Sequence, residues 1–304
     1  RYLEIMQAAL DAVDPYAAVQ AHLRVADGTL WAGERAFVLN KLRRIVVIGA
    51  GKAGSPMARA IEDVLGDAIT AGLVVVKQGH GAPTARIEIV EASHPIPDEA
   101  GVAAGARVLD LAASAGADDL VLALISGGGS ALLEAPAGIS LADLQAMTDS
   151  LLACGATINE INCLRKHMSR VKGGQLARAA SPAALVTLVL SDVVGSPLDV
   201  IASGPTVPDS STWADAWAVV EKYALAEALP AAVMARLRAG VRGEVPDTPK
   251  AGDPIFDRAT TQIVGDNRVA ALAACRRAQE LGYHALLLTT YVEGEAREVA
   301  KLTV

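Results

Sequence analysis

A glycine-rich segment near residue 50 holds the first residues that could do chemistry. Gly49-Ala50-Gly51-Lys52-Ala53-Gly54 satisfies the pattern G-x-G-x-x-G, in which glycines let the backbone approach the diphosphate of a dinucleotide. That pattern also requires an acidic residue about 20 positions later, whereas the next expected strand ends at Lys77. The presence of Lys52 inside the loop favours a role in phosphoryl transfer, in which its ammonium would stabilise the phosphate that is transferred. The alternative is a glycine turn whose lysine faces solvent.

A second segment, Ser126-Gly127-Gly128-Gly129-Ser130, follows an apolar run and has no side chains at its centre. Successive backbone N–H groups can therefore converge on an anion, and the two hydroxyls would add donors. A flexible turn is the alternative, but three glycines cost conformational entropy without packing in return. The segment favours an anion site, which would hold either an ATP phosphate or the carboxylate of a substrate.

A third segment, residues 162–174, is basic in a protein of net charge −7. It contains Arg165, Lys166 and Lys172, and the spacing of Lys166 and Arg170 predicts that they share one helix face. A solvated helix face is the ordinary explanation for such a run. Local basicity in an acidic protein is also what a phosphate site needs.

Two further segments place acidic residues after expected strands. Asp192 follows a strongly apolar run, where a carboxylate is costly to bury unless it is paired or bound to a metal. One carboxylate is enough to hold Mg²⁺ when substrate phosphates supply other ligands. Capping of a helix is the competing role for Asp192. Gly265, Asp266 and Asn267 could cap the next helix or reach a nucleotide, and the sequence leaves both open.

Strands and helices that alternate along the chain must position these segments. Short runs rich in β-branched residues alternate with alanine-rich helical stretches, which predicts a doubly wound, mostly parallel α/β sheet of the Rossmann-like kind. We expect this domain over residues 1–245, a linker over 246–254, and the start of a second α/β domain over 255–304, whose remainder is absent from this sequence. The alternative for residues 255–304 is that they extend the first sheet. The expected strands are 45–48, 73–76, 87–90, 120–125, 184–190, 261–264 and 285–288.

Composition narrows the classes of partner and compartment. The excess of acidic residues disfavours a general nucleic-acid binder, and no apolar run reaches the roughly 18 residues that span a membrane. Three cysteines without a C-x-x-C pair argue against a disulfide framework or a structural zinc, so we expect a cytoplasmic protein. The sequence has no G-x-S-x-G elbow, which disfavours an α/β-hydrolase. It also has no G-x-x-x-x-G-K-[ST] motif, so any phosphoryl transfer is not of the P-loop kind.

Several motifs, taken together, resemble the bacterial and animal glycerate 2-kinase family. They are VVIGAGKA at 46–53, SHP at 93–95, ISGGGSAL at 125–132, RKH at 165–167, VKGG at 171–174, SDV at 191–193 and IASGPT at 201–206. Their order and approximate spacing match from about Asp14 to Lys301. The resemblance implies transfer of the γ-phosphoryl of ATP to the 2-hydroxyl of D-glycerate, giving 2-phosphoglycerate. It also implies Mg²⁺ and a cleft between two α/β domains, of which the second is MOFRL-like.

On this interpretation, Lys52 acts on the phosphate in flight and Asp192 on Mg²⁺ or the incoming hydroxyl. Phosphate or substrate would be bound by Gly51, Ser126, Gly127, Gly128, Gly129, Ser130, Arg165, Lys166 and Lys172, and the nucleotide by Gly265, Asp266 and Asn267. The family's later segments G-G-E-T-T and G-T-D-G do not occur here, so we expect the natural protein to be longer.

Other functions stay open at this point. Some members of the family carry the name hydroxypyruvate reductase, and an NADPH-dependent reductase using Gly49 to Gly54 and Lys77 is the main alternative. A sugar-phosphate-sensing regulator is the non-enzymatic alternative, although no basic recognition segment is evident at either end. The sequence leaves the oligomeric state open, and a homodimer is one option.

Overall fold

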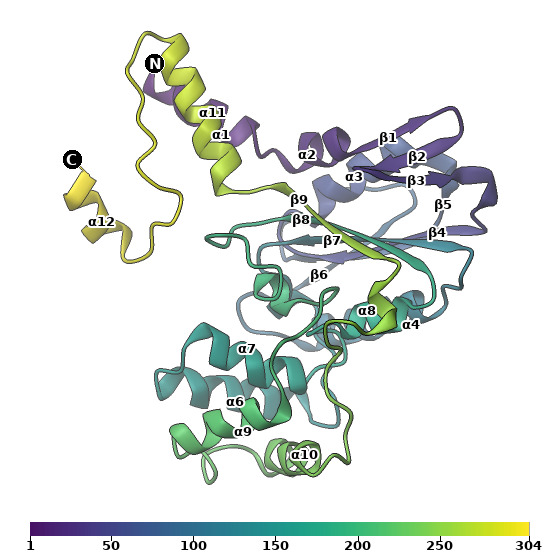
Figure 1. The fold of residues 1–304 in the computed structure, drawn as a ribbon, viewed down its shortest axis with the longest axis vertical. Helices are drawn as coiled ribbons and strands as arrows, with labels where there is room; N and C mark the ends of the chain where they lie inside the picture. Colours follow the sequence, from purple (N-terminus) through teal and green to yellow (C-terminus); the bar gives the residue numbers. More distant parts are fainter. Residues whose placement is uncertain (304) are drawn as a thin grey trace.

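The computed structural model describes residues 1–303, and Val304 lies outside the described residues. Its centre is a six-stranded parallel sheet with the strand order β6-β5-β4-β7-β8-β9 (Figure 1). The strands are β4 (Arg44–Ala50), β5 (Ile69–Lys77), β6 (Glu88–Ala92), β7 (Asp119–Ser126), β8 (Ala184–Leu190) and β9 (Ala259–Gly265). Six of the seven expected strands are therefore confirmed, and so is the doubly wound α/β fold.

The strand order determines where a ligand can bind. Numbered in chain order from β4, the six strands lie in the order 3-2-1-4-5-6, which is that of a dinucleotide-binding sheet. The direction of winding reverses between β4 and β7. Loops that leave the carboxyl ends of these two strands turn to opposite faces, so a crevice opens between them.

Residues alternate along the central strands and build a core on each face of the sheet. Val47 of β4 packs in the core that holds α2 (Pro15–His22) and α3 (Gly54–Leu65). Its neighbours Val46 and Ile48 pack in the opposite core, with α4 (Glu99–Ala113) and α8 (Gln175–Ala180). Because both faces are covered, the central strands are apolar throughout, as the sequence predicted.

The amino end of β7 is anchored by charge. Asp119 is fully buried, and its carboxylate accepts hydrogen bonds from Arg43 and Arg44. These guanidinium groups hold the pKa of the Asp119 carboxyl well below its usual range. This ion pair fixes one end of the strand whose other end carries the triple-glycine loop.

A separate helical lobe lies beside the sheet (Figure 1). Its helices are α6 (Leu141–Ala153), α7 (Ile158–His167), α9 (Trp213–Lys222) and α10 (Ala231–Val241), and they share one apolar core. Capping boxes begin three of them, at Ser140, Thr157 and Thr212. Helix α7 carries part of the basic segment into the site.

The remaining elements lie mostly near the chain ends. Helix α1 (Tyr2–Asp11) packs along α11 (Asn267–Glu280), and α12 (Ala296–Thr303) is the last helix (Figure 1). An antiparallel sheet that the sequence analysis did not predict consists of β1 (Leu23–Ala26), β2 (Thr29–Ala32) and β3 (Arg35–Val38). The short elements are α5 (Gly129–Leu132), η1 (Leu39–Lys41), η2 (Gly66–Ala68), η3 (Ile201–Ser203) and η4 (Pro254–Phe256).

Strand β9 pairs with β8, so residues 259–265 extend the first sheet, which is one of the two alternatives that the sequence left open. The structure differs from the prediction at the next expected strand. Residues 285–288 form no strand, and Leu286 and Leu288 are exposed, because no partner strand lies beside them among residues 1–303. The domain boundaries themselves stay a prediction. Across the described part of the chain, no helix is long and apolar enough to cross a membrane.

Candidate active site

Loops from four neighbouring strands line a cavity of about 460 Å³ at the carboxyl edge of the sheet. Lys52 follows β4, Gly127 follows β7, Asp192 follows β8, and Asp266 follows β9. We call this space the Lys52 cavity. The sequence analysis placed each of these segments after an expected strand, and the structure brings them together because parallel strands end at one edge.

Lys52 and Asp192 bring opposite charges to this cavity, and neither charge is paired with another group of the described protein. Neither the Lys52 ammonium nor the Asp192 carboxylate makes a hydrogen bond or ion pair with any residue among 1–303. Asp192 also precedes no helix, so the capping role considered for it does not apply. Two unpaired charges that face one cavity are available to a ligand.

The triple-glycine loop permits this convergence because it has no side chains. A Cβ placed on Gly127 would lie 2.1 Å from an oxygen of Asp192. A Cβ on Gly128, whose φ is +87°, would lie 3.0 Å from the ring of His94 and 3.1 Å from Cε of Lys52. The loop is therefore a surface against which three side chains from three other loops pack.

We expect Gly128→Ala to lower both stability and activity. Alanine strains the left-handed backbone there, which costs about 1 kcal/mol or more, and its methyl group displaces Lys52. The free energy of unfolding from urea denaturation and the turnover number measure the two effects. Gly155→Ala is the matched control, because Gly155 has φ +76° with nothing near its Cβ position. An active Gly128→Ala protein would show that the close approach is not needed.

His94 is a candidate site residue that the sequence analysis did not single out. Its ring lies against Gly128 and makes no hydrogen bond within residues 1–303. Burial and the nearby Lys52 ammonium lower the pKa of His94, which favours the neutral ring. Its position in an S-H-P motif that belongs to the resemblance was the signal that could have identified it.

The first glycine loop does not offer its amides to a ligand. The N–H groups of Gly51, Lys52 and Ala53 donate to the Val75 carbonyl, the Gly127 carbonyl and the Ser126 hydroxyl respectively. Gly54 donates back to Gly51. A dinucleotide bound through G-x-G-x-x-G needs such amides for its diphosphate, and the end of β5 carries Lys77 rather than an acid. These contacts disfavour a nicotinamide cofactor at this loop.

The second loop keeps its amides free. The N–H groups of Gly127 and Gly128 donate to no atom of residues 1–303. The Ser130 hydroxyl is 2.7 Å from that of Ser203, which donates to Asn162. Gly127 and Gly128 can therefore bind an anion, whereas Ser130 is held by protein contacts.

Arg165 holds this loop from behind. Its Nη2 donates to the Ser130 carbonyl at 2.8 Å, and it lies 4.0 Å from the buried carboxylate of Glu134. Burial lowers the pKa of Arg165, and its Nε is buried without a partner among the described residues. Arg165 also lines a cavity of about 280 Å³ with Gly127 and Asp192, which we call the Arg165 cavity.

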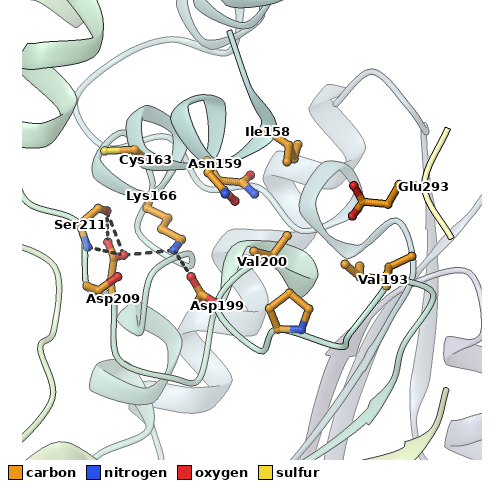
Figure 2. A pocket seen from close by; sticks show the side chains of 14 residues that line it. Ile158, Asn159, Cys163, Lys166, Val193, Asp199, Val200, Asp209, Ser211 and Glu293 are labelled. Atoms are coloured by element: carbon orange, nitrogen blue, oxygen red, sulfur yellow. Dashed lines mark hydrogen bonds and ion pairs between the residues drawn. The ribbon is translucent and has the colours of Figure 1, made fainter. Parts of the chain in front are cut away.

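Lys166 faces a third, adjoining cavity of about 530 Å³, shown in Figure 2. Its ammonium lies 3.1 Å from Asp209 and 3.6 Å from Asp199. Two carboxylates therefore neutralise the ammonium of Lys166, which the sequence analysis assigned to phosphate or substrate binding. Lys166 and Arg170 also do not share a helix face, because α7 ends at His167.

Lys172 does not reach any of these cavities, which corrects its assignment as a phosphate ligand. Only 1% of its side chain is exposed, and its ammonium contacts the carboxylate of Glu134 at 2.6 Å. It also donates to the Leu133 carbonyl at 3.0 Å. The ammonium of Lys172 therefore stabilises the chain behind the triple-glycine loop through these two contacts.

We expect Lys172→Met to destabilise the fold by about 3–5 kcal/mol, because it leaves the Glu134 carboxylate buried without its closest partner. Urea denaturation measures this loss. Lys222→Met is the control: Lys222 also pairs with a glutamate, but at the surface, and its loss should be much smaller. Equal losses in the two variants would contradict a structural role for Lys172.

The predicted nucleotide segment after β9 lies at the site but is partly used by the protein. Asp266 caps α11 by accepting the Val269 N–H, and Asn267 donates to the Thr290 carbonyl. Both line the Lys52 cavity. Capping, one of the two roles left open, is therefore confirmed for Asp266, and contact with a nucleotide stays a prediction.

A metal at this site would have few protein ligands. Within residues 1–303, no group of three or more histidine, cysteine, aspartate or glutamate side chains is placed to hold a metal ion. The unpaired Asp192 carboxylate suits Mg²⁺, which commonly takes one or two protein carboxylates and otherwise water and substrate phosphates. The site is suited to a metal that arrives with a nucleotide.

Comparison with known proteins places this geometry in a family. A family model described as "Domain of unknown function (DUF4147)" matches residues 1–238. The chain is 42% identical over 297 residues to a glycerate 2-kinase from Pyrococcus horikoshii, covering 97% of this chain and 66% of that protein. It is 46% identical over 260 residues to an Agrobacterium vitis protein named as a hydroxypyruvate reductase, covering 85% of this chain and 57% of that one.

A solved structure agrees in fold. The crystal structure of glycerate kinase from Thermotoga maritima superposes with a TM-score of 0.83 at 39% identity, covering 99% of this chain and 66% of that one. The chain thus spans about two thirds or less of the length of the relatives it matches. With the family model matching most of its length, the chain belongs to the DUF4147 family, which is the glycerate kinase family.

Proposed function

We propose that the natural protein transfers the γ-phosphoryl of ATP to the 2-hydroxyl of D-glycerate, giving 2-phosphoglycerate and ADP. One observation carries this proposal: the unpaired Lys52 ammonium and Asp192 carboxylate face one cavity beside the free amides of Gly127 and Gly128. Phosphoryl transfer needs such positioning and charge neutralisation more than it needs covalent help. The names of the relatives, glycerate 2-kinase and glycerate kinase, suggest that glycerate is the acceptor of the phosphoryl group.

Asp192 and Gly127 line both the Lys52 cavity and the Arg165 cavity. We therefore assign the triphosphate of ATP to the Lys52 cavity, close to Asp266 and Asn267, and glycerate to the Arg165 cavity. The hydroxyl and the phosphate would then meet beside Asp192. In this arrangement the free amides of Gly127 and Gly128 bind an anion at the junction, either a phosphate or the glycerate carboxylate.

The proposed reaction divides the work between two side chains. As the 2-hydroxyl oxygen bonds to the γ-phosphorus, the bond from phosphorus to the ADP oxygen breaks and the hydroxyl proton leaves. Lys52 stabilises the negative charge on the phosphoryl oxygens, and Asp192 accepts the proton. Asp192 is also the residue that would hold Mg²⁺, which when bound neutralises the ATP phosphates.

Two assays on the natural gene product test the proposal. ATP with D-glycerate should release ADP and form 2-phosphoglycerate, and NADPH with hydroxypyruvate should show no oxidation. The backbone amides around Gly51 already donate to other protein atoms, and β5 ends in a lysine rather than an acid. Both features argue against the reductase. Oxidation of NADPH without any ADP release would overturn the kinase. Ligand binding without turnover in either assay would favour the sugar-phosphate-sensing regulator.

We further propose a cytoplasmic protein that acts on a small molecule and binds neither membrane nor nucleic acid, which rests on its composition as argued above. Cell fractionation with an antibody to the natural protein tests the compartment. A homodimer stays a prediction, and sedimentation velocity of the natural gene product measures the assembly.

A further inference from the structure

A fourth cavity lies away from the candidate active site. It measures about 350 Å³ and shares no lining residue with the Lys52 cavity, the Arg165 cavity or the cavity that Lys166 faces. Helices α4, α8 and α10 border it, together with the turn after His167 and residues 245–246. We call it the arginine pocket, because Arg170, Arg178 and Arg236 line it.

The three guanidinium groups retain donors that the protein does not use. The Arg170 side chain makes no hydrogen bond or ion pair among residues 1–303 and is exposed. Arg236 uses only its Nε, which donates to the His167 carbonyl, while its guanidinium lies over the Trp213 ring. Arg178 donates to Gln175 and, at 3.3 Å, to the Asp247 carbonyl.

Within residues 1–303, no carboxylate forms an ion pair with any of these three side chains. None of the residues that line the pocket is an aspartate or a glutamate. The nearby Asp247 carboxylate is taken by His167, at 2.9 Å, and by Lys250, at 3.1 Å. Burial lowers the pKa of Arg236. In a chain of net charge −7, three uncompensated arginines around one cavity are unusual.

The shape and the walls of the cavity indicate the size of a ligand. A volume of about 350 Å³ suits a small metabolite rather than a nucleotide or a protein segment. Leu109, Ala137, Ala179 and Val245 provide an apolar wall, and Ser169 and Gln175 add polar groups. Arginine binds carboxylate and phosphate oxygens through paired N–H groups, which gives both charge and geometric selectivity.

We propose that the arginine pocket is a second ligand site, which binds a small oxyanion with two or more negative charges. A phosphate monoester and a dicarboxylate share this chemistry. The site is separate from phosphoryl transfer, so the inference stands whether or not the kinase activity is found. It also accounts for Arg170, whose charge the sequence analysis grouped with the active-site lysines.

Isothermal titration calorimetry of the natural gene product, without ATP or glycerate, tests the site at low ionic strength. Inorganic phosphate and succinate are the probes for the two ligand types. We expect saturable binding of at least one probe, and Arg170→Ala or Arg178→Ala should weaken it about tenfold, the loss expected for one charge-assisted contact. The probe that binds more tightly identifies the ligand type.

Two further variants locate the bound anion. Arg238→Ala removes the same charge from α10 at an exposed position outside the pocket, and should leave the affinity unchanged. Lys52→Ala should also leave it unchanged, because Lys52 lines a different cavity. The proposal is overturned by three results: no saturable binding of either probe, equal affinity in wild type and Arg170→Ala, or binding that Lys52→Ala abolishes and Arg170→Ala preserves.

Discussion

Lys52→Ala should lower kcat for phosphorylation of D-glycerate by about a thousandfold or more, with little change in Tm. A cation that neutralises phosphoryl oxygens in the transition state typically contributes such a factor. The Lys52 side chain is half-buried and lies next to the triple-glycine loop, where it lines the Lys52 cavity. Methyl at this position keeps the loop backbone but removes the charge.

Stability should change little because the side chain makes no contact that holds the fold. The backbone N–H of Lys52, which ties the loop to Gly127, is retained in the alanine variant. Steady-state kinetics and a thermal melt separate the two effects. Lys41→Ala, at an exposed position before the amino end of β4, is the control for loss of one positive charge. Turnover of the Lys52→Ala protein at the wild-type rate would remove Lys52 from the mechanism.

Asp192→Asn should lower kcat by about a hundredfold to ten-thousandfold, the range expected when a positioned base is lost. Asparagine has nearly the same shape, so contact with Gly127 is kept while the negative charge and the proton acceptor are lost. Since Asp192 caps no helix and pairs with no residue among 1–303, the fold should not be weakened.

The magnesium dependence of the variant distinguishes the two roles proposed for Asp192. If the carboxylate takes the proton, kcat falls and the Mg²⁺ concentration for half-maximal rate stays the same. If it holds the metal, that concentration rises. Asp253→Asn is the control, since Asp253 caps the short helix η4 and asparagine caps equally well. An unchanged kcat and an unchanged Mg²⁺ dependence together would exclude both roles.

Much of the sheet could be predicted from local sequence. Strands buried on both faces, such as β7 and β8, are continuous apolar runs, and these are recognisable without any knowledge of their neighbours. The run at 285–288 has the same composition but forms no strand, because a strand needs a partner to satisfy its backbone. The sheet of β1 to β3 was missed because its strands are only four residues long, although Asp27-Gly28 between β1 and β2 is a strong signal for a hairpin turn.

The candidate site was predicted in its parts rather than in its contacts. Lys52, the triple-glycine loop and Asp192 could be singled out because each follows a strand and carries chemistry that a turn does not require. Lys172 and Arg170, within the same basic segment, could not be told apart by sequence. In the structure Lys172 pairs with the buried Glu134, while Arg170 lines a different cavity.

The sequence alone determined the six strands of the central sheet, the loops that follow them, and the residues that can carry charge, because these properties depend mainly on neighbours along the chain. Only the tertiary structure decided that β4 and β7 are adjacent, that the amides of Lys52 and Ala53 donate to Gly127 and Ser126, and that the amide of Gly127 remains free. A hydrogen bond between two loops depends on strand order, and strand order depends on packing between residues far apart in the chain. The choice between a nucleotide cradle and a phosphoryl-transfer site is made at that level.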